Sequence, residues 1–584
     1  MQNDIAAADE PLLGNGVNYG TTQDTADATR QDDIDRTKDL LDSGGQAGVE
    51  KADATNLVCT RSAFMLTYCF IFLNFFVNSL QQQTISNLLP YVVSDFSAHS
   101  LIPTIGITSY ILSGVLKLPI AKMIDTCGRP QGFAVMTALA TLGLVLMSVC
   151  KDVKTYAAAK IFYGVGFSGL AYILEVIIAD TSSLKTRSLA LAFAHSPYIA
   201  TTFAGPAAAQ WFLQYSSWRT AFASFAVVTP LTAISVYAIL ESNAMEAKRR
   251  GELKEVKRDR TWSESFWHFT IELDAVGVLL LGIGFSLFLL PFSLAGSAGS
   301  KWSSPGIIAT VVLGSILTVV LLLYERYCAS KPFLPIQLLL SGDVMGACIL
   351  STTLFIAYFS WDGYYTSYLQ VVHQLSVSEA GYVDNVYSIG SCLWAIVVGW
   401  LINATDRFRW LAWVAVPIQL LGGASMVVFR QPDTPIAYVI MCQVLIAVGG
   451  GTLVVTGQMA VMSIAKHGEV ASLLALLGLS SAMGAGVGSS VSGAIWSNTV
   501  YAELLRLLPD DAKDMAKEIY ENLELQLSYP VGNPVREAVM LAYGTAQRRM
   551  VVAGMAVLLV AIPAVAVWRD VRVSQLQQVK GRVL

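Results

Sequence analysis

Long apolar runs separated by short polar segments occupy the chain from Ser62 onward. Each run is long enough to cross about 30 Å of hydrocarbon as an α-helix. We count fourteen such runs, beginning near Ser62, Ile102, Gln131, Tyr156, Ser188, Thr220, Asp274, Gly306, Val344, Gly381, Trp410, Ile436, Ala471 and Met550. The pattern predicts an all-α polytopic membrane protein.

The segment before these runs is polar and acidic. Up to Glu50 it holds eleven Asp and Glu residues against Arg30, Arg36 and Lys38. Such a segment cannot bury enough apolar surface to fold, and it lacks the basic start and apolar core of a signal peptide. We expect residues 1–60 to be a disordered cytoplasmic tail.

The basic residues of the loops favour one side of the membrane. With the N-terminus in the cytoplasm, the inner loops carry fifteen Lys and Arg residues and the short outer loops carry five. Positive charge concentrates in cytoplasmic loops, so this bias supports both the orientation and an even number of spans. The basic run Lys248–Arg260 then lies at the cytoplasmic face, where it can touch anionic lipid.

One outer loop, residues 501–544, is too long to be a simple connection. Its apolar residues recur at helical spacing: Leu504, Leu505, Leu508, Met515, Ile519 and Leu523. We expect an ordered amphipathic segment that acts as a lid over the outer mouth.

Composition narrows the class of protein. Of 584 residues only 14% are charged and 54% are apolar, whereas soluble domains average about 25% charged residues. This excludes a soluble enzyme, a nucleic-acid binder and a disordered scaffold. The eight cysteines show no C-x-x-C and the five histidines no H-x-x-x-H, so we expect no metal site, no cofactor and no catalytic triad.

Two inner loops carry related segments, AKMIDTCGRPQG after span two and GWLINATDRFR after span ten. Aligning Arg129 with Arg407 places Asp125 over Asn403, as expected for parallel repeats in a transporter. Charged residues at this boundary can form ion pairs between neighbouring spans in one conformation and break them in another. We therefore take Asp125, Arg129 and Arg407 as gating candidates. The alternative is a topogenic arginine with a helix-capping aspartate.

Polar side chains within the spans are the candidate site residues, because they are costly in lipid. In span one, Asn74, Asn78 and Gln81 share a stripe with Gln82. The stripe either lines a substrate cavity or holds helices together by hydrogen bonds.

Spans four and five add ionisable groups. Tyr172 and Glu175 share one face of span four, and Glu175 is our first candidate for a proton-carrying acid unless it is paired structurally with Lys117. In span five His195 and Tyr198 align on one face. A histidine titrates near physiological pH, so His195 is a second proton-coupling candidate, with a purely structural role as the alternative.

Span nine has the most side chains of this kind, five of them within about 120° of arc at 100° per residue: Tyr358, Trp361, Asp362, Tyr365 and Tyr368. An aromatic wall with one carboxylate suits a bulky ligand, and Asp362 is a third proton-coupling candidate. The alternative is an interfacial aromatic belt. Asp384 of span ten either extends this face or starts its helix.

These motifs resemble known transport families. The segment from Ala121 to Gly132 resembles the inner-loop signature of the major facilitator superfamily, with Ala121 replacing the usual first glycine, and Gly205-Pro206 is similar to the Gly-Pro element of its proton-coupled antiporters. Four blocks resemble the fungal siderophore-iron transporters: Asp180–Pro206, Phe359–Trp394, Gly488–Thr499 and Tyr529–Met550.

The resemblance implies a fourteen-helix major facilitator fold with two six-helix bundles and two linker helices. The boundaries that we expect are a tail at 1–60, an N-terminal bundle at 61–241, a basic loop at 242–273, two intervening helices at 274–327, a C-terminal bundle at 328–568 and a tail at 569–584.

By the same resemblance, the protein takes up ferric siderophores, of the hydroxamate type, by proton symport across the plasma membrane, or an endosomal or vacuolar membrane. The iron arrives already chelated, so no resident metal cage is needed. Two alternatives stay open: a proton-coupled exporter of drugs or glutathione, and a non-transporting siderophore receptor.

Overall fold

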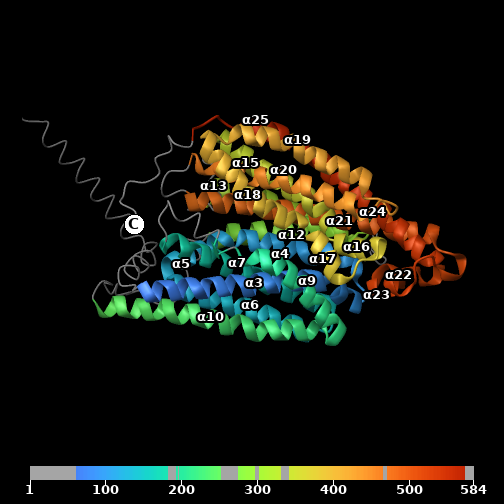
Figure 1. Cartoon of the computed structure of the whole chain (residues 1–584), viewed down its shortest axis with the longest axis horizontal. Helices are drawn as coiled ribbons and strands as arrows, with labels where there is room; N and C mark the ends of the chain where they lie inside the picture. Colours follow the sequence, from blue (N-terminus) through green and yellow to red (C-terminus); the bar gives the residue numbers. More distant parts are fainter. Residues whose placement is uncertain are drawn as a thin grey trace, which may run out of the picture.

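The computed structural model describes residues 61–181, 193–194, 196–250, 274–295, 302–329, 341–464 and 470–572. Within these ranges the chain forms helices and their connections, without a β-strand. Most helices run along one common axis (Figure 1). The prediction of an all-α fold is confirmed.

The helices form two groups that follow the order of the chain, the first in the lower half of Figure 1 and the second in the upper half. The first group is α3 (Arg61–Asp95), α4 (Ile102–Val115) with α5 (Lys117–Cys127), α6 (Arg129–Val149), α7 (Val153–Thr181), α9 (Pro197–Tyr215) and α10 (Trp218–Arg249). The second is α15 (Gly342–Asp362) with α16 (Tyr365–His373), α17 (Val377–Asp384) with α18 (Val386–Thr405), α19 (Arg409–Phe429), α20 (Ile436–Met462), α21 (Val470–Leu507) and α24 (Pro534–Leu558) with α25 (Ala561–Ala566). We call them the N-terminal and C-terminal halves.

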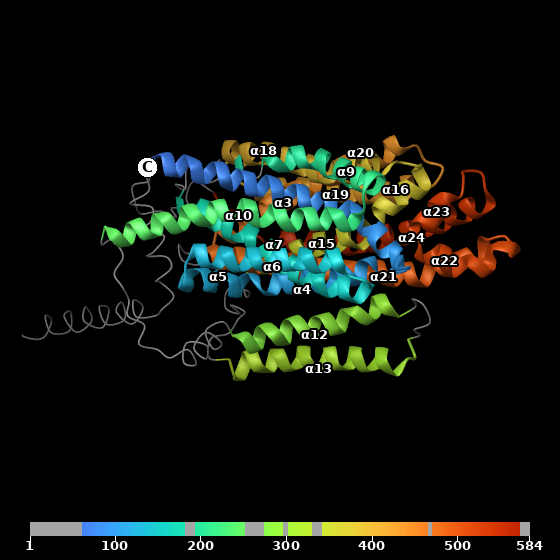
Figure 2. The same cartoon turned by 90° about the horizontal axis from the view of Figure 1, so that it is seen from below.

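Two further helices, α12 (Ala275–Leu294) and α13 (Pro305–Tyr327), lie beside the halves (Figure 2). α12 packs on α4 and α21, and α13 packs on α12. Gly314 allows the close approach of this pair, since a Cβ there would lie 2.4 Å from the backbone nitrogen of Phe288. The pair occupies the place of the two predicted linker helices.

Thirteen helices in the described ranges are long and apolar enough to cross a membrane. α9 runs beside them but is not among these thirteen, and the start of the corresponding predicted span, near Ser188, lies outside the described residues. A polytopic membrane protein is confirmed, whereas the count of fourteen is not. The outward face of α10 fits lipid, because Val227, Leu231 and Ile234 are 60%, 61% and 59% exposed.

A small helical segment extends beyond the spans at the right of Figure 1. It comprises residues 508–533 with η2 (Asp510–Met515), α22 (Ala516–Glu521) and α23 (Leu523–Ser528). We call it the outer segment and its end of the molecule the outer end, following the charge bias of the loops. The amphipathic pattern appears here as short helices with Ile519 and Leu523 fully buried, and the flanking helices α21 and α24 extend into the predicted loop.

Candidate functional site

The two halves contact each other at the outer end. The Tyr364 hydroxyl donates to the Ser100 carbonyl at 2.6 Å, and the His99 ring bonds the Ser367 hydroxyl at 3.0 Å. Tyr91 also donates to the Gln370 side chain. These contacts join the end of α3 and the α3–α4 turn in the N-terminal half to α16 and the residue before it in the C-terminal half. The outer end is therefore closed.

A second contact between the halves lies beside α9. The Asn385 amide donates to the Thr202 carbonyl at 3.3 Å, and the Ser378 backbone N–H donates to Gln210 at 3.1 Å. Gly381 packs so tightly that a Cβ would lie 2.6 Å from Pro206. The Gly-Pro element of α9 therefore abuts α17 within this closure.

The outer segment covers the closure and binds both halves. The Glu521 carboxylate accepts from the Ser100 backbone N–H at 3.0 Å and hydroxyl at 2.8 Å, while the Leu523 N–H donates to the Ser94 hydroxyl at 3.0 Å. On the other side, the Gln526 side chain accepts from the Tyr543 hydroxyl of α24 at 2.7 Å. Burial raises the pKa of the Glu521 carboxyl, and the Ser100 hydrogen bonds offset part of that rise.

Three of the predicted side chains, Tyr172, Glu175 and Tyr198, are half-buried in helices of the N-terminal half. The Tyr198 hydroxyl lies near Glu175 and also near Cys392 of α18, in the opposite half. The Nζ of Lys117 lies 3.6 Å from a Cβ built at Gly478 of α21. His195 lies outside the described residues.

The polar stripe of α3 is directed mainly toward α10. The Asn74 amide donates to the Thr232 carbonyl at 3.1 Å, and the Gln81 carbonyl accepts from the Thr229 hydroxyl at 2.7 Å. Asn78 is buried as well. The exposed neighbour Gln82 accepts instead from Tyr198 at 3.4 Å. The structure thus places Asn74 and Gln81 in a contact between helices of one half.

The aromatic residues of span nine form one cluster. Trp361 contacts Tyr358 at 5.1 Å and Tyr365 at 5.3 Å between ring centroids, and Tyr368 follows at 6.4 Å from Tyr365. Tyr365 and Tyr368 are fully buried under the outer closure. Only Tyr358 and Trp361 also border an internal cavity.

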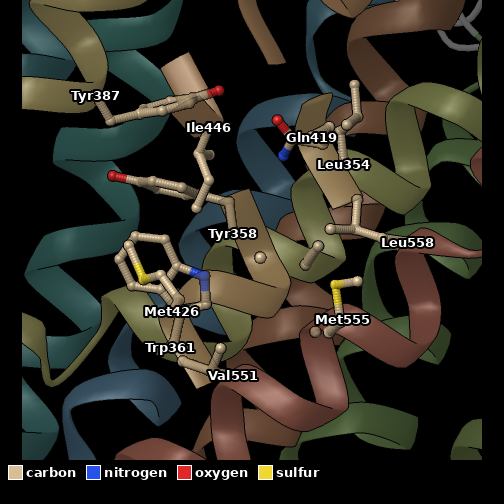
Figure 3. Close-up of a pocket in the computed structure, with 13 residues that line it drawn as sticks. Leu354, Tyr358, Trp361, Tyr387, Gln419, Met426, Ile446, Val551, Met555 and Leu558 are labelled. Carbon is tan, nitrogen blue, oxygen red and sulfur yellow. The ribbon is translucent and has the colours of Figure 1, made fainter. Parts of the chain in front are cut away.

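That cavity has a volume of about 30 Å³, enough for one or two water molecules at about 10–15 Å³ each. Tyr387, Tyr358 and Trp361 lie in a row along one side, opposite Gln419 (Figure 3). The buried Gln419 carbonyl has no protein hydrogen-bond partner, so a water molecule there would satisfy it. The cavity is too small for a bulky ligand.

The sequence did not identify Arg430 as a site residue, because it was counted among the basic residues of the outer loops. The side chain is 1% exposed. Its guanidinium carbon lies 4.3 Å from the Trp361 ring centroid and 4.1 Å from that of Tyr365. The available signal was its position, a single cation directly after an apolar span.

The gating candidates lie at the inner end, in ion pairs within each half. Arg129 Nε donates to the Asp180 carboxylate at 2.8 Å, and Arg407 binds Asp570 at 2.6 Å. The side chain of Asp125 lies outside the described part of the structure. No cluster of three or more His, Cys, Asp or Glu side chains that could hold a metal ion occurs in the described ranges.

Known proteins resemble this chain over most of its length. The Major Facilitator Superfamily profile matches residues 71–489. A protein named MFS siderochrome iron transporter 1 from Ajellomyces capsulatus is 42% identical over 97% of both chains. MFS siderochrome iron transporter D from Aspergillus fumigatus is 43% identical over 96% of this chain and 93% of its own.

Solved structures share the fold at low identity. A peptide transporter POT in complex with sulfate matches 86% of this chain and 95% of its own with a TM-score of 0.54 and 14% identity. A bacterial homologue of the human lysosomal transporter Spinster, in an inward-facing and unoccupied conformation, matches 87% of this chain and 98% of its own with a TM-score of 0.52 and 14% identity. The full-length relatives show that the chain belongs to the fungal siderophore-iron transporter family of the major facilitator superfamily.

Proposed function

We propose that this protein takes up ferric-siderophore complexes by proton symport. The observation that carries the proposal is the 42–43% identity, over nearly the whole chain, to relatives named siderochrome iron transporters. The iron travels inside its chelator, so recognition needs polar and aromatic side chains and not a metal cage. We propose a hydroxamate siderophore as cargo and the plasma membrane as the location.

The arrangement of the halves supports alternating access. The outer end is closed by hydrogen bonds such as that from Tyr364 to Ser100, and the Tyr198 hydroxyl lies near both Glu175 and Cys392 of the opposite half. Rocking of the halves would expose this region to one side at a time. We propose Glu175 as a proton carrier and Tyr172, Tyr198 and Tyr358 as cargo contacts.

The test is radioiron uptake in fungal cells that lack their own siderophore carriers. Uptake of iron from ferrichrome or a fusarinine-type complex, lost with a protonophore, is the expected result. Glu175→Gln should abolish accumulation at normal surface expression, while Glu246→Gln, which removes an exposed carboxylate of α10, should not. Toxin resistance or thiol efflux without uptake would indicate an exporter, and binding without accumulation would indicate a receptor.

A further inference from the structure

Asp362 and Asp384, the last residues of α15 and α17, meet in the C-terminal half. Tyr358, one turn before Asp362, contacts Tyr387, three residues after Asp384, with ring centroids 5.0 Å apart. The two carboxyl groups therefore lie close enough to interact directly. Both side chains are half-buried. While the site is closed to water, two neighbouring carboxylates do not both ionise, because their repulsion is not screened. In this closed structure the pair therefore holds one proton, which can leave only when the site opens to water.

The positive charge of the buried Arg430 side chain requires a compensating negative charge, which the two aspartates can supply. Its Nη1 donates to the Gln547 carbonyl at 3.0 Å, but its Nε and Nη2 have no hydrogen-bond partner and are buried. The guanidinium acts electrostatically on both Asp362 and Asp384. A buried cation requires a compensating anion. One proton on the two carboxyl groups leaves a single negative charge, which makes the cluster neutral.

The other titratable groups around the pair are four tyrosines and one histidine. They are Tyr358 of α15, Tyr387 of α18, Tyr365 of α16 and Tyr110 of α4, with His373 near Arg430. Tyrosine titrates near pH 10. Of the histidine and the two aspartates, only Asp362 acts electrostatically on Tyr110, which belongs to the N-terminal half. A change in the charge of the pair therefore acts across the interface between the halves.

We propose that Asp362 and Asp384 form one proton-binding pair, with Arg430 as its fixed counter-charge, and that this pair couples transport to the proton gradient. The proposal rests on the proposed proton symport. A proton from outside forms an O–H bond with one carboxylate and is later released to water on the inside, with no other bond changed. The singly protonated, neutral cluster is the loaded form, and release of the proton leaves one net negative charge.

The test uses the full-length protein in liposomes with the membrane potential clamped at zero and a gradient of about one pH unit. If one proton accompanies each neutral cargo, wild type should accumulate radioiron ferrichrome about tenfold. Asp384→Asn or Asp362→Asn leaves one carboxylate to balance the charge of Arg430, so the cluster is neutral without a proton. In either variant the concentration of radioiron ferrichrome inside the liposomes should only reach that outside. Exchange of labelled for unlabelled ferrichrome across the membrane should continue. Asp433→Asn, an exposed carboxylate three residues beyond Arg430, should accumulate as wild type does.

A second measurement detects the proton bound to Asp362 and Asp384 directly and does not depend on transport. At neutral pH the infrared carboxylic C=O band of the shared proton should be present in wild type and Asp433→Asn, and lost in either single variant. Asp384→Asn that keeps both the band and tenfold accumulation would overturn the pair. If wild type exchanges neither ferrichrome nor a fusarinine-type complex, the proposed cargo is wrong. The infrared band then still shows whether Asp362 and Asp384 share a proton. Folding of each variant is checked by its unfolding temperature.

Discussion

Glu521 accepts two hydrogen bonds from Ser100, one from the backbone N–H at 3.0 Å and one from the hydroxyl at 2.8 Å. The two residues are 421 positions apart. Glu521 ends α22 of the outer segment, and Ser100 lies in the turn before α4 of the N-terminal half. This pair is therefore one of the points at which the outer segment is fixed over the closed outer end.

Replacing Glu521 by alanine should loosen this attachment. The buried Ser100 N–H would lose its acceptor, at a cost of about 1–3 kcal/mol. We expect a lower unfolding temperature and faster amide exchange in α22. Glu518→Ala is the matched control, since Glu518 lies in the same helix but is exposed. Equal effects of the two substitutions would show that the Ser100 contact contributes nothing.

Glu521 should also make the docking of the outer segment depend on pH. Burial raises the pKa of this carboxyl above its ordinary value, so the docked state favours the protonated form. The corresponding stability is fully present below the ordinary carboxyl pKa and is lost as the pH rises through the raised value. Glu521→Gln cannot ionise. It should therefore unfold at a higher temperature than wild type at neutral pH, with a difference that shrinks on acidification. A difference that does not change with pH would contradict this prediction.

The helices of the fold could be predicted because an apolar run is a local property of the chain. The beginning of the last span could not. It was expected near Met550, but α24 begins at Pro534, because its polar first turns are buried against other elements. Arg536 shows this, since it donates to the carbonyls of Val371 and Gln526. Such partners are distant in sequence or lie in other helices, so local hydropathy does not identify them.

The candidate site was predictable only in part, for the same reason. Helical spacing correctly indicates that Asn74 and Gln81 share a face of α3, but not that this face meets Thr232 and Thr229 of α10. Arg430 was assigned to a loop exposed to water, yet it is buried beside aromatic rings that lie more than sixty residues earlier in the chain. Which helix a polar stripe faces is decided by tertiary packing.

The two aligned arginines of the inner loops should differ in importance. Arg129 is buried and bound to Asp180 at 2.8 Å, whereas Arg407 and its partner Asp570 are both more than two-fifths exposed. Breaking a buried pair leaves an uncompensated charge. Because Asp180 is partly exposed, we expect the low end of the usual range, about 3 kcal/mol, for Arg129→Ala. Arg407→Ala should cost less than about 1 kcal/mol.

The exchange of both charges separates the ion pair from other effects of the Arg129 substitution. The double variant Arg129→Asp with Asp180→Arg should regain part of the stability that Arg129→Asp loses, measured by thermal unfolding in detergent. No recovery would show that Arg129 acts through other contacts, such as its bond to the Ile124 carbonyl at 3.2 Å.

The close contact between α21 and α15 should be sensitive to a single methyl group. A Cβ at Gly484 would lie 2.5 Å from the Thr352 carbonyl oxygen, and one at Gly488 would lie 2.7 Å from that of Ile356. Small residues one turn apart let two membrane helices approach closely. The atoms in the way belong to the backbone and cannot rotate aside, so Gly484→Ala must push the helices apart, at a cost of about 1–3 kcal/mol. Gly399→Ala in α18 is the control, because a Cβ there meets nothing within 4 Å. It should unfold at the wild-type temperature or above, since alanine favours helix over glycine, and an equal loss of stability in both variants would show that packing against α15 is not the cause.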